Sequence, residues 1–250
     1  MVQFPSNVGN LLQTATVFIL FLNNEVRSQT YPDSPDSTQP SQWTNSNFDK
    51  HCSPFGVSMF AEKAYPRDKF VHACNVMAQM LDNDQDGCAD DINVVQKIRL
   101  TQSGMAMYAS ENSETEVSEN FAGQPLYADE TQPSCSGSSE TASCRDAAIE
   151  EILHVVTGKG VGVAYTNDFS DCYTNQASIN TMQKQMDIAR GGHFTTIPST
   201  YPSGSIYHYD DATCDYRCMA TEFIYWALTS LLDGQGKCKH TFYFLFLIFS

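Results

Sequence analysis

The sequence predicts an α-rich α+β fold, formed by a single globular domain with few strands. Several stretches repeat their apolar residues at helical spacing, which is typical of helices that bury one face. Stretches that read as strands are few and short. The chain has 250 residues, of which 42% are hydrophobic and 12% aromatic, so it can bury one substantial core.

The order of elements follows from these patterns and from the residues that begin and end them. Pro66 opens the first helical stretch, and Gly191-Gly192 ends a later one. Ser143 with Asp146 resembles a capping box, and Gly158 is placed to stop the helix that they begin. The expected helices are 66–81, 92–100, 143–158, 178–190 and 220–232. Strands are expected at 55–61 and 105–109, within a loop-rich 103–142.

The first 50 residues predict export followed by a linker. Thr14–Leu22 is a short apolar run, with the length of a signal-peptide core and too short to span a membrane. We expect residues 1–27 to be a signal peptide, with a buried strand as the alternative for the apolar run. Residues 28–50 are rich in Ser, Pro, Thr, Gln and Asp, which predicts a flexible linker before the globular domain at 51–236.

Charge and cysteine content predict an extracellular protein. The chain carries 14 basic and 29 acidic residues, a net charge of −15, which argues against nucleic acid as a partner. Nine cysteines without Cys-x-x-Cys pairs favour disulfides over a structural zinc site. Cys214 and Cys218 either tie their segment to the core or bridge one another. An extracellular protein or peptide is the partner that this environment suggests.

Alternating aspartates after the first helix predict a calcium loop. In Asp82–Gly87 every second residue is an aspartate, and Gly87 can adopt the positive φ that a sharp turn after the third ligand requires. Carboxylates at such positions converge on one point when the chain curls. The expected calcium ligands are Asp82, Asp84, Asp86, the backbone carbonyl of Cys88, and Asp90.

This loop resembles the calcium loops of EF-hands, dockerins and thrombospondin-like repeats. The helices expected on either side fit an EF-hand-like helix–loop–helix. Position 12, where an EF-hand has a bidentate Glu, is Asn93, and Asp91 is the substitute if the loop is tighter. The alternative is a surface turn without an ion. A calcium ion here is expected to hold structure rather than to signal, because a single hand lacks a partner hand.

A second candidate metal site lies in Glu150-Glu151-Ile152-Leu153-His154. A helix places Glu150 and His154 one turn apart on the same face, which suits two ligands of one zinc or other divalent ion. Glu151 beside them is placed to act as a general base on a bound water. The third ligand is expected from Glu222 or from Asp187.

The run Glu150–Tyr165 resembles the active-site helix of the thermolysin-like gluzincin metallopeptidases, which carries His-Glu-x-x-His. The resemblance implies that Glu151 is the base and His154 a zinc ligand, and it puts Glu150 where the family has its first histidine. The family's downstream Asn-Glu-x-x-x-Ser-Asp pattern is absent. Three alternatives remain: an amphipathic helix with a solvated polar face, a metal site without peptidase activity, and a working hydrolase.

Two further features complete the sequence-based expectations. The segments 81–91, 150–165, 186–192 and 215–232 resemble an uncharacterised group of secreted proteins from marine invertebrates and microbes, which implies a shared fold and a shared acidic site. Residues 237–250 form an atypical hydrophobic tail. Our hypothesis is that this tail is a truncated or altered end, and that Cys238 is half of a bridge whose partner is lost.

Two functions follow from these observations. The first is a secreted metal-dependent hydrolase, peptidase-like, with Glu151 as its base. The second is a non-catalytic extracellular binding or matrix protein that calcium stabilises.

Overall fold

A computed structural model of the chain describes residues 45–118, 120–135 and 145–231, and it confirms a single α-rich α+β domain. The expected signal peptide at 1–27, most of the expected linker and the hydrophobic tail at 237–250 lie outside the described residues. The expected cap residue Ser143 also lies outside them.

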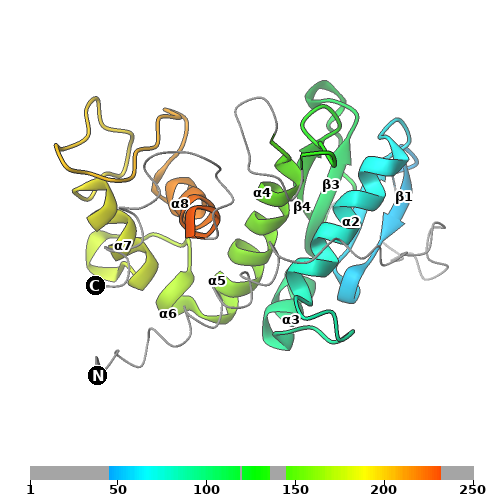
Figure 1. The fold of residues 1–250 in the computed structure, drawn as a ribbon, viewed down its shortest axis with the longest axis horizontal. Coiled ribbons are helices and arrows are strands. Elements are labelled where there is room, and N and C mark those ends of the chain that lie inside the picture. Colours follow the sequence, from blue (N-terminus) through cyan, green and yellow to red (C-terminus); the bar gives the residue numbers. More distant parts are fainter. Residues whose placement is uncertain (1–44, 119, 136–144, 232–250) are drawn as a thin grey trace.

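A mixed sheet of four strands forms one side of the domain (Figure 1). Its strands are, in spatial order, β1 (Phe48–Cys52), β2 (Met59–Glu62), β3 (Ser103–Tyr108) and β4 (Ala122–Tyr127). β1 pairs with β2 in antiparallel fashion, whereas β2–β3 and β3–β4 are parallel. β4 was not expected from the sequence, because Gly123 and Pro125 are rare inside strands. β1 begins at Phe48, inside the segment assigned to the linker.

The helices lie close to where their patterns place them, and their bounds are as follows. Before the site helix come α2 (Arg67–Leu81) and α3 (Ile92–Leu100), together with the short 3-10 helices η1 (Pro54–Gly56) and η2 (Glu111–Ser113). The site helix is α4 (Ala147–His154), and it continues as the π-helix η3 (Val155–Val161) and as α5 (Gly162–Ala164). After it come α6 (Thr166–Phe169), the 3-10 helix η4 (Gln176–Ser178), α7 (Thr181–Arg190) and α8 (Tyr216–Leu231).

The expected end of the site helix at Gly158 is wrong, because the chain stays helical beyond it as η3 and α5. Asp146 is the N-cap, and its side chain accepts a hydrogen bond from the backbone N–H of Ala148. η3 packs against α3, where Gly160 lies close to Val94 and Ile98. Tertiary packing of this kind outweighs the low helix propensity of glycine.

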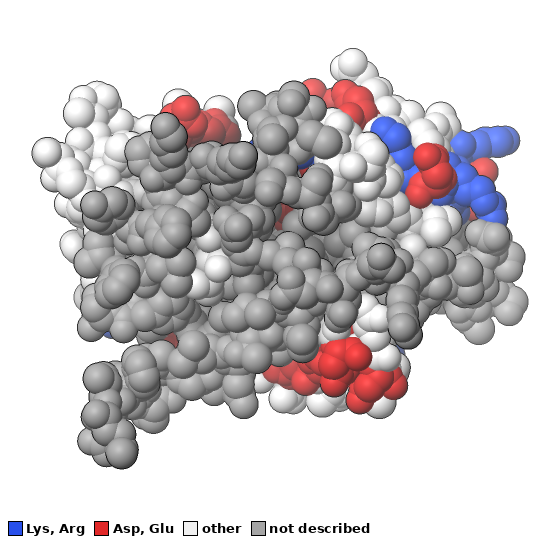
Figure 2. All heavy atoms as spheres, in the orientation of Figure 1, with Lys and Arg blue, Asp and Glu red and all other residues white. Residues whose placement is uncertain are grey.

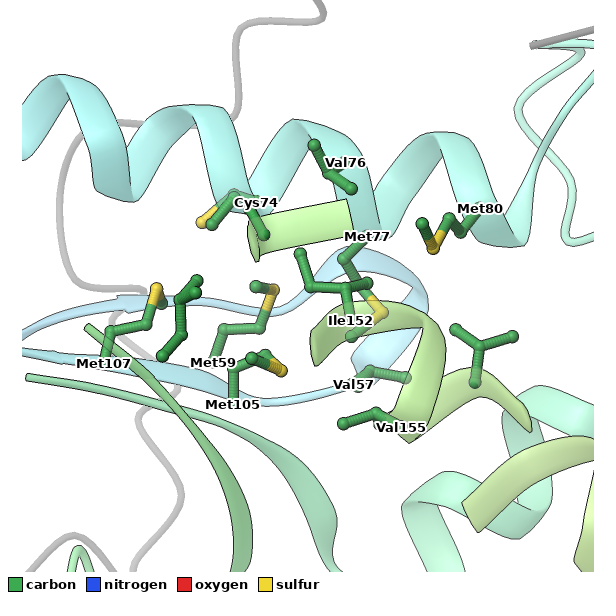
Figure 3. Close-up of a cluster of buried hydrophobic side chains, with 14 of the residues drawn as sticks. Val57, Met59, Cys74, Val76, Met77, Met80, Met105, Met107, Ile152 and Val155 are labelled. Atoms are coloured by element: carbon green, nitrogen blue, oxygen red, sulfur yellow. The ribbon is translucent and has the colours of Figure 1, made fainter. Parts of the chain in front are cut away.

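Two apolar cores flank the site helix. The first lies between the sheet and helices α2 and α4, where Met59, Met105 and Met107 of the sheet face Met77 of α2 and Ile152 of α4 (Figure 3). The second joins α7 to α8 and to the segments that lead into them. A smaller apolar cluster covers the other face of the sheet. α4 and its buried side chains are therefore held from the sheet side and from the α8 side.

Two disulfides join pairs of cysteines that both lie in the described part of the chain. Cys52 of β1 is bonded to Cys74 of α2, which joins the sheet to the helix above it across a sequence separation of 22 residues. Cys214 is bonded to Cys218, so of the two alternatives for these residues the mutual bridge is the one that forms. Such bonds are typical of oxidising compartments. Among the described residues no helix combines the length and the apolarity that a membrane crossing requires.

Substitution of the two glycines of η3 is expected to give opposite results. A Cβ at Gly160 would lie 2.6 Å from a methyl of Val94, so Gly160→Ala should lower the free energy of unfolding by about 1–3 kcal/mol through overpacking. A Cβ at Gly158 would meet no atom of another described residue within 4 Å, so Gly158→Ala should be neutral or stabilise by about 0.5–1 kcal/mol. Urea unfolding of both variants checks this, and equal effects would contradict the packing argument.

Candidate metal centre

The polar face of α4 is covered by protein. Ile152 and Leu153 pack into the first core, and the opposite face carries Glu150, Glu151 and His154. The side chains of these three residues are only 12%, 20% and 9% exposed. Figure 1 shows the reason, since α4 lies between the sheet and α8. An ordinary amphipathic helix exposes its polar face to solvent. In α4 that face is covered by protein.

α8 brings Glu222 to α4. The side chain of Glu222 is 15% exposed, and its Oε1 lies 3.6 Å from Nε2 of His154. Glu150, His154 and Glu222 each offer one ligand atom, and these three atoms lie within 4.8 Å of one another. The set contains one imidazole nitrogen and two carboxylate oxygens, a combination that suits zinc and other divalent ions.

His154 has a buried nitrogen that no group in the described part of the chain satisfies. Its Nε2 is inaccessible to solvent and makes no hydrogen bond there, because 3.6 Å to Glu222 is beyond hydrogen-bond distance. Its Nδ1 lies 3.6 Å from Oε2 of Glu151, and the ring packs edge-on against Tyr225. Buried polar atoms without a partner are rare in folded proteins, and a bound cation is one common explanation.

Glu151 is held from the sheet rather than from α8. Nε2 of Gln124, in β4, donates a hydrogen bond of 2.6 Å to Oε2 of Glu151. Glu151 is therefore placed beside the group of Glu150, His154 and Glu222 without being part of it. This separation gives the neighbouring carboxylates of α4 different surroundings.

Arg145 covers the outer side of Glu150. Its Nη2 donates a hydrogen bond to Oε2 of Glu150 and lies 3.5 Å from the hydroxyl of Tyr225. The guanidinium carbon is 5.5 Å from the ring centres of both Tyr225 and Trp226. Two aromatic faces and one carboxylate thus fix the position of this cation.

The pKa values of Glu150, Glu222 and His154 are all raised, by burial for the two carboxyls and by neighbouring carboxylates for the imidazole. Burial raises the pKa of Glu150 to about 7, although Arg145 acts in the opposite direction. Burial also raises the pKa of Glu222, and nearby His154 offsets part of that rise. For His154 burial lowers the pKa, but contact with Glu151 and the charge of Glu222 outweigh it, so the pKa lies above its ordinary value. A positive charge among the side chains of Glu150, His154 and Glu222 is therefore favourable.

Asp187, the other expected ligand, lies in a different cluster. Its oxygens accept hydrogen bonds from Arg190 (2.9 Å) and pair with Nδ1 of His193 (2.7 Å). Arg190 is fully buried and also bonds the carbonyl of Phe194, so this cluster anchors the chain after α7. The structure thus brings Glu222, and not Asp187, to Glu150 and His154.

The aspartate loop between α2 and α3 curls as its sequence predicts. Gly87 has a φ of +89°, and its N–H donates to Oδ2 of the buried Asp82. Carboxylate oxygens of Asp82, Asp84 and Asp86 lie within 4.8 Å of one another. Figure 2 shows acidic side chains gathered at this edge of the molecule. These three residues form a second group that could hold a metal ion.

The remaining expected calcium ligands have other contacts. Oδ2 of Asp90 accepts from the backbone N–H of Asn83, and Asp90 is outside the group of three aspartates. Asp91, the alternative last ligand, caps α3 by accepting from Asn93 and Val94, and it also accepts from the hydroxyl of Tyr165. The side chain of Cys88 is an exposed free thiol.

Two residues of the site were missed by sequence reasoning. Gln124 lies in a strand whose glycine and proline hide the strand pattern. Arg145 lies before the site helix, because α4 begins only at Ala147. Its separation of five residues from Glu150 does not correspond to one helical turn, so the sequence does not predict their contact.

Neutralising Glu150 is expected to stabilise the metal-free protein at high pH. Its folded pKa of about 7 exceeds the ordinary 4.5, so the folded state binds the extra proton and stability falls as pH rises through this window. After chelator treatment, Glu150→Gln should therefore be more stable than the unmodified protein by on the order of 1–3 kcal/mol at about pH 8, and the gap should close near pH 5.

Urea unfolding at the two pH values measures this gap. Glu116→Gln, at an exposed carboxylate far from α4 along the chain, is the matched control and should show no such pH-dependent gap. A gap for Glu150→Gln that is equal at both pH values would show that burial of this carboxylate does not shift its ionisation.

Comparison with known proteins gives no family for this chain. No family model, no curated protein and no solved structure matches it. The geometry of Glu150, Glu151, His154 and Glu222 is therefore the basis for any functional conclusion.

Proposed function

We propose that this protein is a metal-dependent hydrolase in which Glu150, His154 and Glu222 bind a zinc or similar divalent ion. The observation that carries the proposal is the buried Nε2 of His154, which has no hydrogen-bond partner among the described residues and lies among carboxylates. A divalent ion would satisfy this nitrogen and offset the charges that burial makes unfavourable. Three protein ligands would be typical of a catalytic rather than a structural zinc site.

Glu151 is the general base of the proposed reaction. A metal ion held by Glu150, His154 and Glu222 would supply Lewis acidity to the reaction. Glu151 lies next to the ligand group, and Gln124 holds one of its oxygens at 2.6 Å. That hydrogen bond orients the carboxylate and leaves its other oxygen to accept a proton. Its place beside the ligands supports a role as base rather than as ligand.

A peptide is the proposed substrate class, because the run Glu150–Tyr165 resembles the active-site helix of the gluzincin metallopeptidases. β4 is an edge strand of the sheet among the described residues, and it lies beside α4. Its edge offers little to an extended peptide, because Pro125 has no N–H and the N–H of Tyr127 already donates to Oε1 of Glu130. The substrate proposal therefore rests on the helix and not on the strand edge.

Substitutions of ligands and base should separate metal binding from catalysis. His154→Ala and Glu222→Gln should each lower zinc affinity by about tenfold or more, and hydrolysis of a fluorogenic peptide library should be lost with the metal. Glu151→Gln should keep stoichiometric zinc and lose about 10²–10⁴-fold in rate. Zinc content by mass spectrometry and initial rates measure both. Unchanged zinc content in His154→Ala would overturn the metal site.

A second candidate function is a calcium-stabilised extracellular binding or matrix protein without catalysis. The convergence of Asp82, Asp84 and Asp86 around the Gly87 turn supports a calcium ion in this loop. The expected further ligands are the carbonyl of Cys88 and Asp90, and extracellular calcium is high enough to fill a weak site. The disulfides Cys52–Cys74 and Cys214–Cys218 fit an oxidising, extracellular location, where a protein or peptide partner would be met.

Calcium should stabilise the protein through this loop. At about 100 times its dissociation constant, calcium should raise the free energy of unfolding by about 2.7 kcal/mol. Asp84→Asn should remove most of this gain, whereas Asp210→Asn, at an exposed aspartate outside the loop, should leave it intact. Urea unfolding with calcium and with chelator measures the gain. A gain that survives Asp84→Asn would place the calcium elsewhere.

A further inference from the structure

The candidate metal centre carries more negative charge than a divalent ion neutralises. Three carboxylates, those of Glu150, Glu151 and Glu222, surround the single imidazole of His154. Their charge of −3 and an ion of +2 sum to −1, in surroundings that are largely shielded from water. An excess negative charge lowers the ability of a bound cation to polarise its substrate. A compensating positive group would restore neutrality.

Arg145 is that positive group. Its guanidinium contacts Oε2 of Glu150, and adding its charge brings the sum of the centre from −1 to 0. The side chain is 41% exposed, yet its head group packs against the rings of both Tyr225 and Trp226. A planar guanidinium can stack on aromatic rings while it donates to a carboxylate, which an ammonium group does less well.

The contact also limits how Glu150 can be used. A carboxylate has two oxygens, and Arg145 engages one of them. Glu150 offers one oxygen to the group with His154 and Glu222, and Oε1 is the oxygen that this contact with Arg145 does not engage. Groups that hydrogen-bond to a ligand in this way orient it, and their removal typically costs about 10–100-fold in metal affinity.

We propose that Arg145 is a positioning residue of the metal centre, which orients Glu150 and offsets its charge so that the pair serves as one neutral ligand. This inference rests on the proposed metal site at Glu150, His154 and Glu222. It assigns Tyr225 and Trp226 a role as the aromatic support of the Arg145 head group. It also explains how a carboxylate-rich ligand set can hold a Lewis-acidic ion.

A double-substitution cycle tests the pairing. In the unmodified background, Arg145→Gln should weaken zinc binding by about tenfold or more, because Glu150 loses its orienting donor. In a Glu150→His background the ligand is already neutral, and Arg145 is an uncompensated cation beside the ion. There Arg145→Gln should strengthen zinc binding or leave it unchanged. Isothermal titration with zinc alone measures all four proteins.

Controls separate this coupling from general damage. Arg217→Gln removes another arginine, in α8, which pairs with Asp171 at the surface, and it should leave zinc affinity unchanged. Thermal unfolding establishes that each variant is folded. If Glu150→His does not fold, Glu150→Gln is the second neutral background, in which Arg145→Gln should cause no further loss.

The possible results distinguish the role of Arg145 from the metal site itself. Weaker zinc binding in the unmodified background, with no weakening in the neutral background, supports the neutral pair. Equal losses in both backgrounds, or no loss in the unmodified background, overturn the role of Arg145 while the metal site stands. Failure of the unmodified protein to bind stoichiometric zinc overturns the metal site and, with it, this inference.

Discussion

The packing of α4 between the sheet and α8 is the constraint on which the rest of the site depends. Burial of Ile152 and Leu153 in the first core fixes the rotation of the helix, since these side chains can face only the sheet and α2. The same rotation turns Glu150 and His154 toward α8. Because α8 covers that face, the polar side chains are enclosed by protein instead of meeting solvent.

Enclosure has an energetic consequence that shapes the whole centre. Burying three carboxylates beside one imidazole is unfavourable unless each charge finds a partner. Arg145 and Gln124 supply two of these partners, one for Glu150 and one for Glu151. Within the described part of the chain, Nε2 of His154 is left without one. Natural proteins rarely accept such a cost for stability alone, and this cost is the reason for proposing a functional site at this cluster.

The remaining elements hold the two sides of the site together. The Cys52–Cys74 bond joins β1 to α2. Helix α2 contributes side chains to the first core, against which α4 packs. On the other side, the fully buried Arg190 of α7 contacts the sulfur of Met219 in α8 and the carboxylate of Asp187. The contact at Met219 anchors α8 to α7, three residues before Glu222 in α8. Asp187 thus supports the position of Glu222, the proposed ligand, without being one of the group.

From the sequence alone one can predict the fold class, most helix bounds, the turn at Gly87 and the pairing of Glu150 with His154 on one helix face. These features depend on the spacing of residues along the chain, which can be read without the fold. The other features depend on tertiary contacts. Glu222, and not Asp187, reaches the site because α8 packs on α4, and the same packing buries the polar face of α4. Gln124 and Arg145 come from segments outside the apolar repeat of α4. Strand β4 and the helix beyond Gly158 also depend on tertiary contacts, because packing outweighs the local preferences of glycine and proline there.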